Sequence, residues 1–480
     1  MHDDVVLTRY TRSLAAFAAS TDAAEVDVLA TITATLAARD DVDVVFAHEH
    51  AVPRRWAALP DPPHSVAPAI VLAAARETLL APATRRRHGA HYTPYRVARR
   101  LSAIALDRLP FSACATICDP AVGGGIFLVA VADELEERGL DRRSAVDRLW
   151  AADIDPVSVA VARTALRFWA GGAVAGLDER VVVGDPLSCG RAVWPSHDGF
   201  DLVMGNPPFL NQLQRASSRT RQNSQQLIAR FGDAARGYVD SSALFMLAAL
   251  DLASPDGVVL LIQPQSCLSA RDSERVRRVV DEHATLEGLW FCRDRIFGAS
   301  VRVCAPVIRA GHRAPSPVMR WIDRDAVPAA AVTRGVDGGG EWSALIGDLL
   351  GIPTLSLSGG RTLSDIGCRA TSGFRDQFYG FMDATHEVTD RPDETTRLVT
   401  VGMIDPLGLG WGIRTARFAR RDFMAPVVDV GELSASLRAW VDARRGPKLL
   451  VATQTKVIEV AVDGRGDCVP LTPVIELRPP

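Results

Sequence analysis

A four-residue segment in the middle of the chain carries side chains that suit amine chemistry. Asn206, Pro207, Pro208 and Phe209 follow an apolar run at residues 200–205. Two prolines end a strand, because proline fixes φ and has no N–H for the strand ladder. An amide oxygen and an aromatic face then lie where open α/β sheets bind ligands, and they suit a planar ring with an exocyclic amine. A capped strand end with a core phenylalanine explains the same residues equally well.

Three other apolar runs upstream end in acids or glycines. The first leads into Asp119 and the glycine-rich turn at 121–125, the second ends at Asp153, and the third leads to Asp185. Asp153 is placed to accept both hydroxyls of a ribose, whereas a helix-capping role fits Asp155 better. Because the carboxyl ends of parallel strands share one edge of a sheet, we expect all four segments to face one ligand.

A further candidate element precedes the first of these strands. Tyr92, Thr93 and Pro94 follow a basic stretch and lead into a helical pattern. We expect Thr93 to be the N-cap and Pro94 the first residue of the helix. A helix N-terminus of this kind is electropositive and rich in N–H donors, so it suits a carboxylate.

The surrounding elements predict an α/β protein. Strands expected at 258–262, 286–292 and 301–308 bring the total to seven in a doubly wound sheet, and the last two pair as an antiparallel hairpin around 297–300. Residues 1–85 predict an N-terminal helical accessory layer in which we identify no chemistry. Its longest apolar stretch is interrupted by Arg76 and Glu77. A glycine-rich linker at 335–340 precedes a second domain.

Composition limits the classes of function. The chain has 480 residues and a net charge of −3, so binding to nucleic acid requires a local basic surface. Its eight cysteines form no CxxC pair, and no His cluster has metal-ligand spacing, so we expect reduced thiols and no metal. The acidic N-terminus and the lack of a long apolar span predict a cytoplasmic location without membrane contact. The only lysines are Lys448 and Lys456, so we predict no nuclease site.

In the order of these motifs the chain resembles the TaqI-like gamma class of N6-adenine DNA methyltransferases, which use S-adenosylmethionine. The resemblance covers residues 88–310 and, more loosely, 360–465. It implies that Tyr92, Thr93 and Pro94 contact the methionine end of the cofactor. By the same resemblance, the other cofactor-binding residues are Asp119, Ala121, Gly123 and Gly125 at the methionine and sulfonium, Asp153 at the ribose and Asp185 at the adenine amine.

The resemblance also assigns the target base. Asn206, Pro207 and Phe209 are similar to the catalytic segment that holds the base flipped out of the duplex, and Phe297 is similar to a second stacking aromatic. Two departures from the family pattern are visible. Gly124 stands where the turn usually has serine, and Phe209 replaces the commoner tyrosine, which keeps the stacking face and loses a hydroxyl.

These implications predict a division of the chain into 1–85 (helical region), 86–330 (catalytic domain) and 331–480 (mixed α/β target-recognition domain). The last ends at Pro480, where family members continue, so we expect a compact domain, a partner subunit that completes it, or a degraded gene. Arg414, Arg417, Arg420 and Arg421 are candidate phosphate contacts, although a solvated charged face explains each of them singly.

The predicted activity is site-specific N6 methylation of adenine in double-stranded DNA, in restriction-modification or phage defence. Cytosine N4 methylation uses the same amine geometry and stays open as an alternative. A non-autonomous or catalytically silent DNA-binding subunit of a defence complex is the alternative from a different class.

Overall fold

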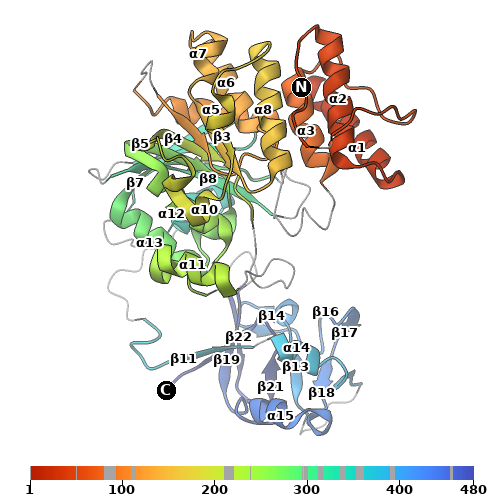
Figure 1. The fold of residues 1–480 in the computed structure, drawn as a ribbon. Coiled ribbons are helices and arrows are strands. Elements are labelled where there is room, and N and C mark those ends of the chain that lie inside the picture. The colour runs from red at the N-terminus through yellow and green to blue at the C-terminus, as the bar shows by residue number, and fades with distance from the viewer. Residues whose placement is uncertain are drawn as a thin grey trace. The chain divides into compact units, whose positions relative to one another are not determined.

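The computed structural model divides the chain into two compact units, Met1–Ile346 and Gly347–Pro480 (Figure 1). It describes residues 2–49, 51–80, 93–110, 115–209, 221–237, 239–294, 296, 301–311, 317–334, 342–352, 362–373, 375–389, 395–453 and 458–480. The linker predicted at 335–340 lies outside these residues. The N-terminal helices share the first unit with the sheet, and the predicted functional division at 85 and 330 stays a prediction.

A mixed sheet forms the centre of the first unit and confirms the predicted α/β class. Its strand order is β10-β9-β7-β8-β5-β4-β1-β2-β3, with β6 pairing with β8. The seven predicted strands occur in it, and the predicted antiparallel hairpin is β7 and β8. The strands are β1 (Ile117–Asp119), β2 (Leu149–Asp153), β3 (Val181–Val183), β4 (Phe200–Gly205), β5 (Ala253–Leu261), β6 (Gln263–Pro264), β7 (Ala284–Phe291), β8 (Val303–Ala310), β9 (Val318–Ile322) and β10 (Val327–Val332).

The sheet is therefore larger than the seven strands predicted. β6 has only two residues, too short for a pattern, and β10 is an exposed or partly exposed edge strand without alternating apolar residues. Such an edge strand is held by pairing with β9 and leaves little trace in hydrophobic periodicity. β5 begins irregularly, and Asp256 near its start has a φ of 64°.

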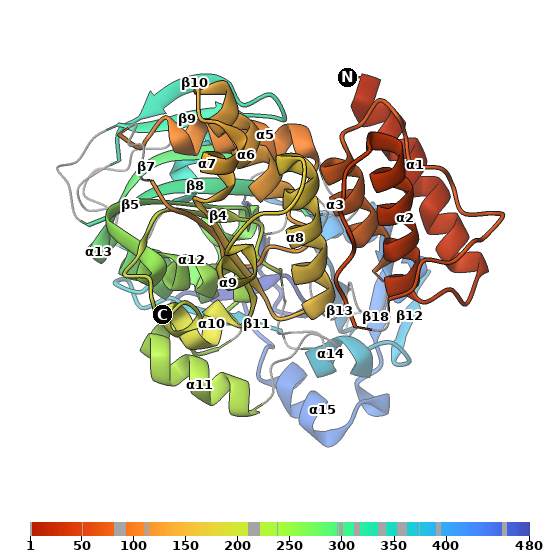
Figure 2. The same ribbon diagram turned by 45° about the horizontal axis from the view of Figure 1, so that its top comes forward.

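Helices cover both faces of this sheet (Figure 2). α5, α6 and α8 pack on one face and share a core with alternate strand residues, while α12 and α13 contact the strands at the other. α1, α2 and α3 form the predicted N-terminal helical layer, and α3 packs against α8 and α6. Within the described residues, none of the helices combines the length and the hydropathy needed to cross a membrane.

The helices of the first unit have the following bounds: α1 (His2–Ser20), α2 (Glu25–Asp40), α3 (Pro68–Leu79), α5 (Tyr95–Leu106), α6 (Ile126–Glu137), α7 (Arg142–Val146), α8 (Pro156–Ala170), α9 (Leu177–Arg180), α10 (Pro186–Cys189), α11 (Arg221–Phe231), α12 (Ser241–Leu252) and α13 (Glu274–His283).

The second unit is built on two four-stranded sheets, ordered β11-β22-β19-β20 and β12-β18-β13-β21, with two smaller hairpins. Its elements are β11 (Arg369–Ser372), α14 (Arg375–Gly380), β12 (Thr385–Glu387), β13 (Arg397–Val399), β14 (Ile404–Asp405), β15 (Gly408–Leu409), β16 (Ala416–Phe418), β17 (Arg421–Phe423), β18 (Pro426–Val428), α15 (Ala435–Asp442), β19 (Lys448–Ala452), β20 (Glu459–Asp463), β21 (Cys468–Pro470) and β22 (Ile475–Arg478).

A buried ion-pair cluster joins strands of both sheets in this unit. The Nζ atom of Lys448 lies 2.8 Å from Asp463 Oδ2, and both side chains are fully buried. Asp463 also accepts hydrogen bonds from the backbone N–H groups of Gly466 and Cys468, and Arg397 pairs with Asp467. The two carboxylates therefore have cationic partners, and burial raises the pKa of the Cys468 thiol, which keeps it protonated. The cluster has the character of a structural ion-pair network.

We predict that Lys448→Met destabilises the second unit by about 3–5 kcal/mol, because it leaves the buried Asp463 carboxylate without its nearest cation. The double variant Lys448→Met/Asp463→Asn removes both charges and should recover part of this loss. Hydrogen exchange of β19 and β20 in the full chain measures the effect. Equal protection in the single variant and the wild type would contradict the prediction.

Candidate functional site

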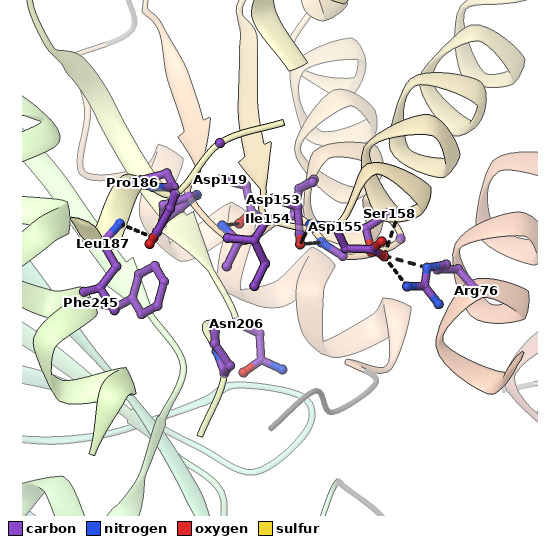
Figure 3. A pocket seen from close by; sticks show the side chains of 18 of the residues that line it. Arg76, Asp119, Asp153, Ile154, Asp155, Ser158, Pro186, Leu187, Asn206 and Phe245 are labelled. Atoms are coloured by element: carbon purple, nitrogen blue, oxygen red, sulfur yellow. Dashed lines mark hydrogen bonds and ion pairs between the residues drawn. The ribbon is translucent and has the colours of Figure 1, made fainter. Parts of the chain in front are cut away.

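Four strand ends meet at one cavity, as the sequence predicts. β4, β1, β2 and β3 are neighbours that run parallel, so their carboxyl ends share one edge of the sheet. Asp119, Asp153, Asp185 and Asn206 stand at or just beyond these ends, and all four line a cavity of about 540 Å³. Figure 3 shows Asp119, Asp153 and Asn206 around this cavity. This volume lies within the range of sites for small molecules and cofactors, ~300–1,000 Å³.

The glycine-rich turn after β1 is held between the strand ends and α3. Gly123 has a φ of +50°, and its N–H donates to Asp153 Oδ2 at 2.9 Å. A Cβ at Gly124 would lie 2.6 Å from the carbonyl oxygen of Ala73 in α3, which no real side chain tolerates. The departure from the family pattern at Gly124 thus has a steric reason, because α3 occupies the space that a serine side chain requires.

Asp119 lies at the centre of this edge and is 2% exposed. Its Oδ1 accepts a hydrogen bond from the Ala121 N–H at 3.0 Å, and a Cβ at Gly205 would overlap the carboxylate. Burial raises the pKa of Asp119 to about 8, and the negative charge of Asp153 acts in the same direction against the hydrogen bond from Ala121. Asp119 therefore holds a proton at neutral pH.

Asp153 and Asp155 have different hydrogen-bond partners, and only one of them caps a helix. Asp155 is the N-cap of α8 and accepts from the N–H groups of Val157 and Ser158, which confirms the capping interpretation. Asp153 caps no helix. It accepts from the N–H groups of Gly123 and Asp155, and burial raises its pKa. Its carboxylate thus connects the glycine-rich turn to the loop after β2.

Asp185 has a structural function that the sequence analysis did not assign. It is the N-cap of the short helix α10, where its Oδ1 accepts hydrogen bonds from the N–H groups of Leu187 at 3.0 Å and Ser188 at 3.3 Å. Both of these hydrogen bonds use the same carboxylate oxygen. The orientation of Asp185 on the cavity wall is therefore fixed by its own helix.

Thr93 contacts Asn206 directly. The Asn206 Nδ2 group donates to Thr93 Oγ1 at 3.0 Å, and Thr93 is 3% exposed. The prediction of Thr93 as a helix N-cap is wrong: α5 begins at Tyr95, Pro94 is its N-cap residue, and no side-chain cap is formed. The Thr93 hydroxyl instead accepts a hydrogen bond from a residue that is distant in sequence. This contact joins the segment before α5 to the end of β4.

The predicted site residues fall into three groups. Those that line the cavity are Thr93, Asp119, Ala121, Gly123, Asp153, Asp185 and Asn206. Those in the described chain that are not among its lining residues are Pro94, Gly125, Pro207 and Phe209. Tyr92 and Phe297 lie outside the described residues.

The second group has identifiable packing roles. Gly125 has a φ of +86°, and a Cβ there would lie 3.1 Å from the Cα of Ala162, so this glycine permits α6 to begin against α8. The Phe209 ring is partly buried and packs on the core of the sheet. Its predicted role in stacking on a base, like the role of Phe297, stays a prediction.

Sequence reasoning missed one whole wall of the cavity, which comes from the N-terminal helices. Glu25 of α2 and Ala73, Arg76 and Glu77 of α3 line it. The available signal was the pair of charged residues that interrupts the apolar stretch of α3. Two apolar lining residues, Ile154 and Phe245, were also missed. Ile154 is 57% exposed at the cavity and gives a flat ligand an apolar surface.

Arg76 connects this wall to the sheet (Figure 3). It is 4% exposed, forms ion pairs with Glu25 and Asp155, and donates from Nε to Ser158 Oγ at 3.3 Å. Burial raises the pKa of Glu25 despite the pairing with Arg76. For Asp155 the effect of burial is outweighed by Arg76 and by hydrogen bonds from Ser158 and Val157, so its pKa is lowered.

The lining of the cavity is strongly acidic. Among the lining residues that the structure describes, Arg76 is the one cation, and six are carboxylic acids: Glu25, Glu77, Asp119, Asp153, Asp155 and Asp185. Because Arg76 is already paired with two of these acids, the cavity keeps an excess of negative charge. Such a lining favours a ligand that carries positive charge and hydrogen-bond donors.

Comparisons with known proteins are consistent with this geometry. A sequence profile described as N-6 DNA Methylase matches residues 72–324. The type IIL restriction-modification enzyme MmeI, solved in complex with DNA, superposes with a TM-score of 0.52 at 12% identity, over 93% of this chain and 73% of that one. At this identity the likeness shows the fold alone. A comparison with curated protein sequences gives no match.

Two other solved structures align less extensively. DrdV in complex with DNA has a TM-score of 0.45 at 16% identity, over 57% of this chain and 33% of that one. The type I restriction enzyme EcoKI M protein has a TM-score of 0.36 at 17% identity, over 48% of each chain. The chain thus spans a third of one of these proteins and about half of the other.

We predict a pH-dependent loss of stability that originates at Asp119. In the unfolded chain its carboxyl ionises near the ordinary value of 3.8, whereas the folded protein holds the proton up to about pH 8. The stabilisation of the folded protein by protonated Asp119 is therefore fully present below about pH 4. It is lost as the pH rises to about 8, by up to about 1.4 kcal/mol per pH unit. Asp119→Asn, which is neutral throughout, should lack this contribution.

Denaturant unfolding of the wild type and of Asp119→Asn between pH 5 and 9 measures the difference in free energy of unfolding. As the pH rises to about 8, the free energy of unfolding of the variant should increase relative to that of the wild type. Above this pH the difference should stay constant. A constant difference across this range would show that Asp119 is ionised in the folded protein.

Proposed function

The chain belongs to the N-6 DNA methylase family, whose methyl donor is S-adenosylmethionine, and we propose that it methylates the exocyclic N6 of adenine in double-stranded DNA. The observation that carries the proposal is the hydrogen bond between Asn206 and Thr93. It fixes an amide at the end of β4, on the wall of the same cavity that Asp153 and Asp185 line. An amine acceptor and a cofactor site are thereby adjacent.

The residues of the cavity fit this cofactor. With a sulfonium, an ammonium and a carboxylate, S-adenosylmethionine carries a net positive charge, which matches the acidic lining. Asp153 is placed to accept the ribose hydroxyls and Asp185 to accept the adenine amine. Ile154, exposed at the cavity between these two strand ends, supplies an apolar surface for the purine.

The chemistry required of the protein is modest. The cofactor supplies a methyl group bonded to a sulfonium, an excellent leaving group. The amide oxygen of Asn206 and the carbonyl of Pro207 accept the two hydrogens of the target amine at ~2.7–3.2 Å and direct its lone pair toward the cavity. Because the protein aligns the amine with the methyl group, no strong base is required.

The target adenine is buried in duplex DNA, so it must be flipped out, at a cost of a few kcal/mol. Phe209 follows the acceptors in the chain, and its partly buried ring is proposed to stack on the flipped base. Phe297 is proposed as the second stacking aromatic on the strength of the resemblance alone. Membership of the TaqI-like gamma class is proposed on the same basis.

A role in restriction-modification is part of this proposal. It is supported by the family and by the likeness to MmeI, a restriction-modification enzyme solved with DNA, which extends over both units of the chain. Double-stranded DNA is the proposed partner, together with a further specificity or defence subunit. Cytosine N4 methylation would use the same acceptors, and the experiment below distinguishes the two bases.

We predict that Asn206→Ala abolishes methyl transfer while S-adenosylmethionine still binds, because the variant loses the amine acceptor and leaves the acids of the cavity in place. The catalytic loss should be at least about 100-fold, the scale for removal of one preorganised polar group in an active site. Modification-sensitive sequencing of DNA from cells that express each protein reports the base, the site and whether the chain acts alone. Calorimetry measures cofactor binding.

Two matched variants sharpen this test. Thr93→Val keeps Asn206 and removes the acceptor that orients its amide, so a smaller loss is expected. Gln225→Ala removes an amide from the exposed surface of α11 and should have no effect. Full methylation by Asn206→Ala would exclude the mechanism, and methylated cytosine in the wild-type sample would exclude adenine as the target.

A hairpin in the second unit is proposed to contact DNA phosphates. β16 and β17 pair as a hairpin that carries Arg417, Arg420 and Arg421, and all three are exposed. Arg420 stands in the turn with a φ of 66°, and the guanidinium of Arg421 lies over the Phe423 ring at 5.0 Å. Arg414 is paired with Asp405 and is a weaker candidate.

We predict that the triple Arg→Ala variant of this hairpin, at positions 417, 420 and 421, weakens DNA binding uniformly across sequences. The slope of log affinity against log salt should fall by about one per lost phosphate contact. The control is a triple variant with the same charge change on other exposed arginines, namely Arg9, Arg12 and Arg55. Equal losses of DNA affinity in the two variants would show that the change in net charge alone explains the effect.

A further inference from the structure

Glu77 of α3 reaches the cavity beside the glycine-rich turn. It is partly buried and lines the cavity, and a Cβ at Gly123 would lie 2.7 Å from its Oε1 atom. The adjacent contact between Gly124 and Ala73 holds this part of α3 against the turn. The part of the α3 backbone that carries Glu77 is therefore fixed against the turn, and the Glu77 carboxylate lies beside it.

The other charged residues of the cavity lie at different parts of it. Arg76 is occupied by Glu25 and Asp155, and it anchors α3 to α2 and α8. Asp153 and Asp185 stand at the ends of β2 and β3, where the ribose and adenine are proposed to bind. Glu77 is the acid that the N-terminal helices place directly against the turn at the end of β1. In the orientation proposed above, with the ribose at Asp153 and the adenine at Asp185, this position faces the amino-acid end of the cofactor.

We propose that Glu77 accepts hydrogen bonds from the ammonium group of the cofactor's methionine moiety, so that the N-terminal helices complete the cofactor site. The ammonium is the hydrogen-bond-donating cation at that end of the molecule, since a sulfonium has no N–H. A carboxylate on a helix packed against the turn is its chemical complement. The inference rests on the family's cofactor and on the orientation proposed above, and it is independent of which base is methylated.

Two thioethers that share the adenosine moiety isolate this contact. S-adenosylhomocysteine carries the amino-acid group, whereas 5′-methylthioadenosine lacks it, and neither has a sulfonium. Glu77→Gln should weaken S-adenosylhomocysteine binding about 10-fold or more, the scale of a hydrogen bond to a charged group. Its affinity for 5′-methylthioadenosine should stay within about 2-fold of the wild type. Calorimetry on the full chain without DNA measures both.

Controls separate this role from a structural one. Glu49→Gln makes the same chemical change at an exposed position of the N-terminal region and should leave both affinities unchanged. Glu77→Asp keeps the charge and shortens the side chain, so it should weaken S-adenosylhomocysteine alone, by less than Glu77→Gln. If thermal melting shows that Glu77→Gln does not fold, Glu77→Asp provides the test instead.

The possible outcomes are distinct. Equal weakening of both ligands would overturn the proposal, because Glu77 would then act on the fold or on the adenosine moiety. Unchanged binding of both would overturn it as well. Failure of the wild type to bind S-adenosylhomocysteine would overturn the proposal together with the cofactor assignment. If Glu77→Gln weakens binding of S-adenosylhomocysteine alone and the wild type methylates no DNA, the Glu77 contact is supported and only the proposed function is rejected.

Discussion

A continuous chain of polar contacts along the edge of the sheet holds the cavity together. Two links are local, from Asp119 to the turn after β1 and from Asp153 to the N–H of Asp155. The other three join different elements, and they are the turn to Asp153, Asp155 to Arg76, and Arg76 to Glu25. Because Asp155 caps α8 and also pairs with Arg76, one carboxylate contributes to the start of that helix and to the position of α3. A local acid thus links the N-terminal helices to the loop after β2.

This arrangement concentrates acids, and the concentration has an energetic cost. Burial raises the pKa values of Asp119, Asp153 and Glu25, so part of the negative charge is suppressed in the folded protein. A cationic ligand reverses that penalty, since it stabilises the ionised carboxylates. A site whose carboxylates are unfavourable without a nearby positive charge therefore favours a cationic ligand over a neutral one.

The sequence predicts what local pattern determines and misses what depends on distant contacts. The strand ends at Asp119, Asp153 and Asn206 follow from apolar runs that stop at glycine, acid or proline. The prediction of Thr93 as a helix cap is wrong because its hydroxyl has two available uses, and the partner that decides between them, Asn206, lies just after β4. The wall formed by α3 was missed because Arg76 and Glu77 appear only as an interruption in an apolar helix, and the partners of Arg76 are on other elements.

The chemistry of the segment after β4 follows from its backbone as much as from its side chains. Neither Pro207 nor Pro208 has an N–H, so two consecutive positions contribute carbonyl oxygens and no donors. The hydrogen bond to Thr93 engages the Nδ2 donor of Asn206, which leaves the amide oxygen on the opposite side of the group. The segment therefore presents acceptors, and it complements an amine with two hydrogens to donate. Under the proposed function these acceptors do not distinguish adenine from cytosine, so the choice of base would have to come from ring size and stacking.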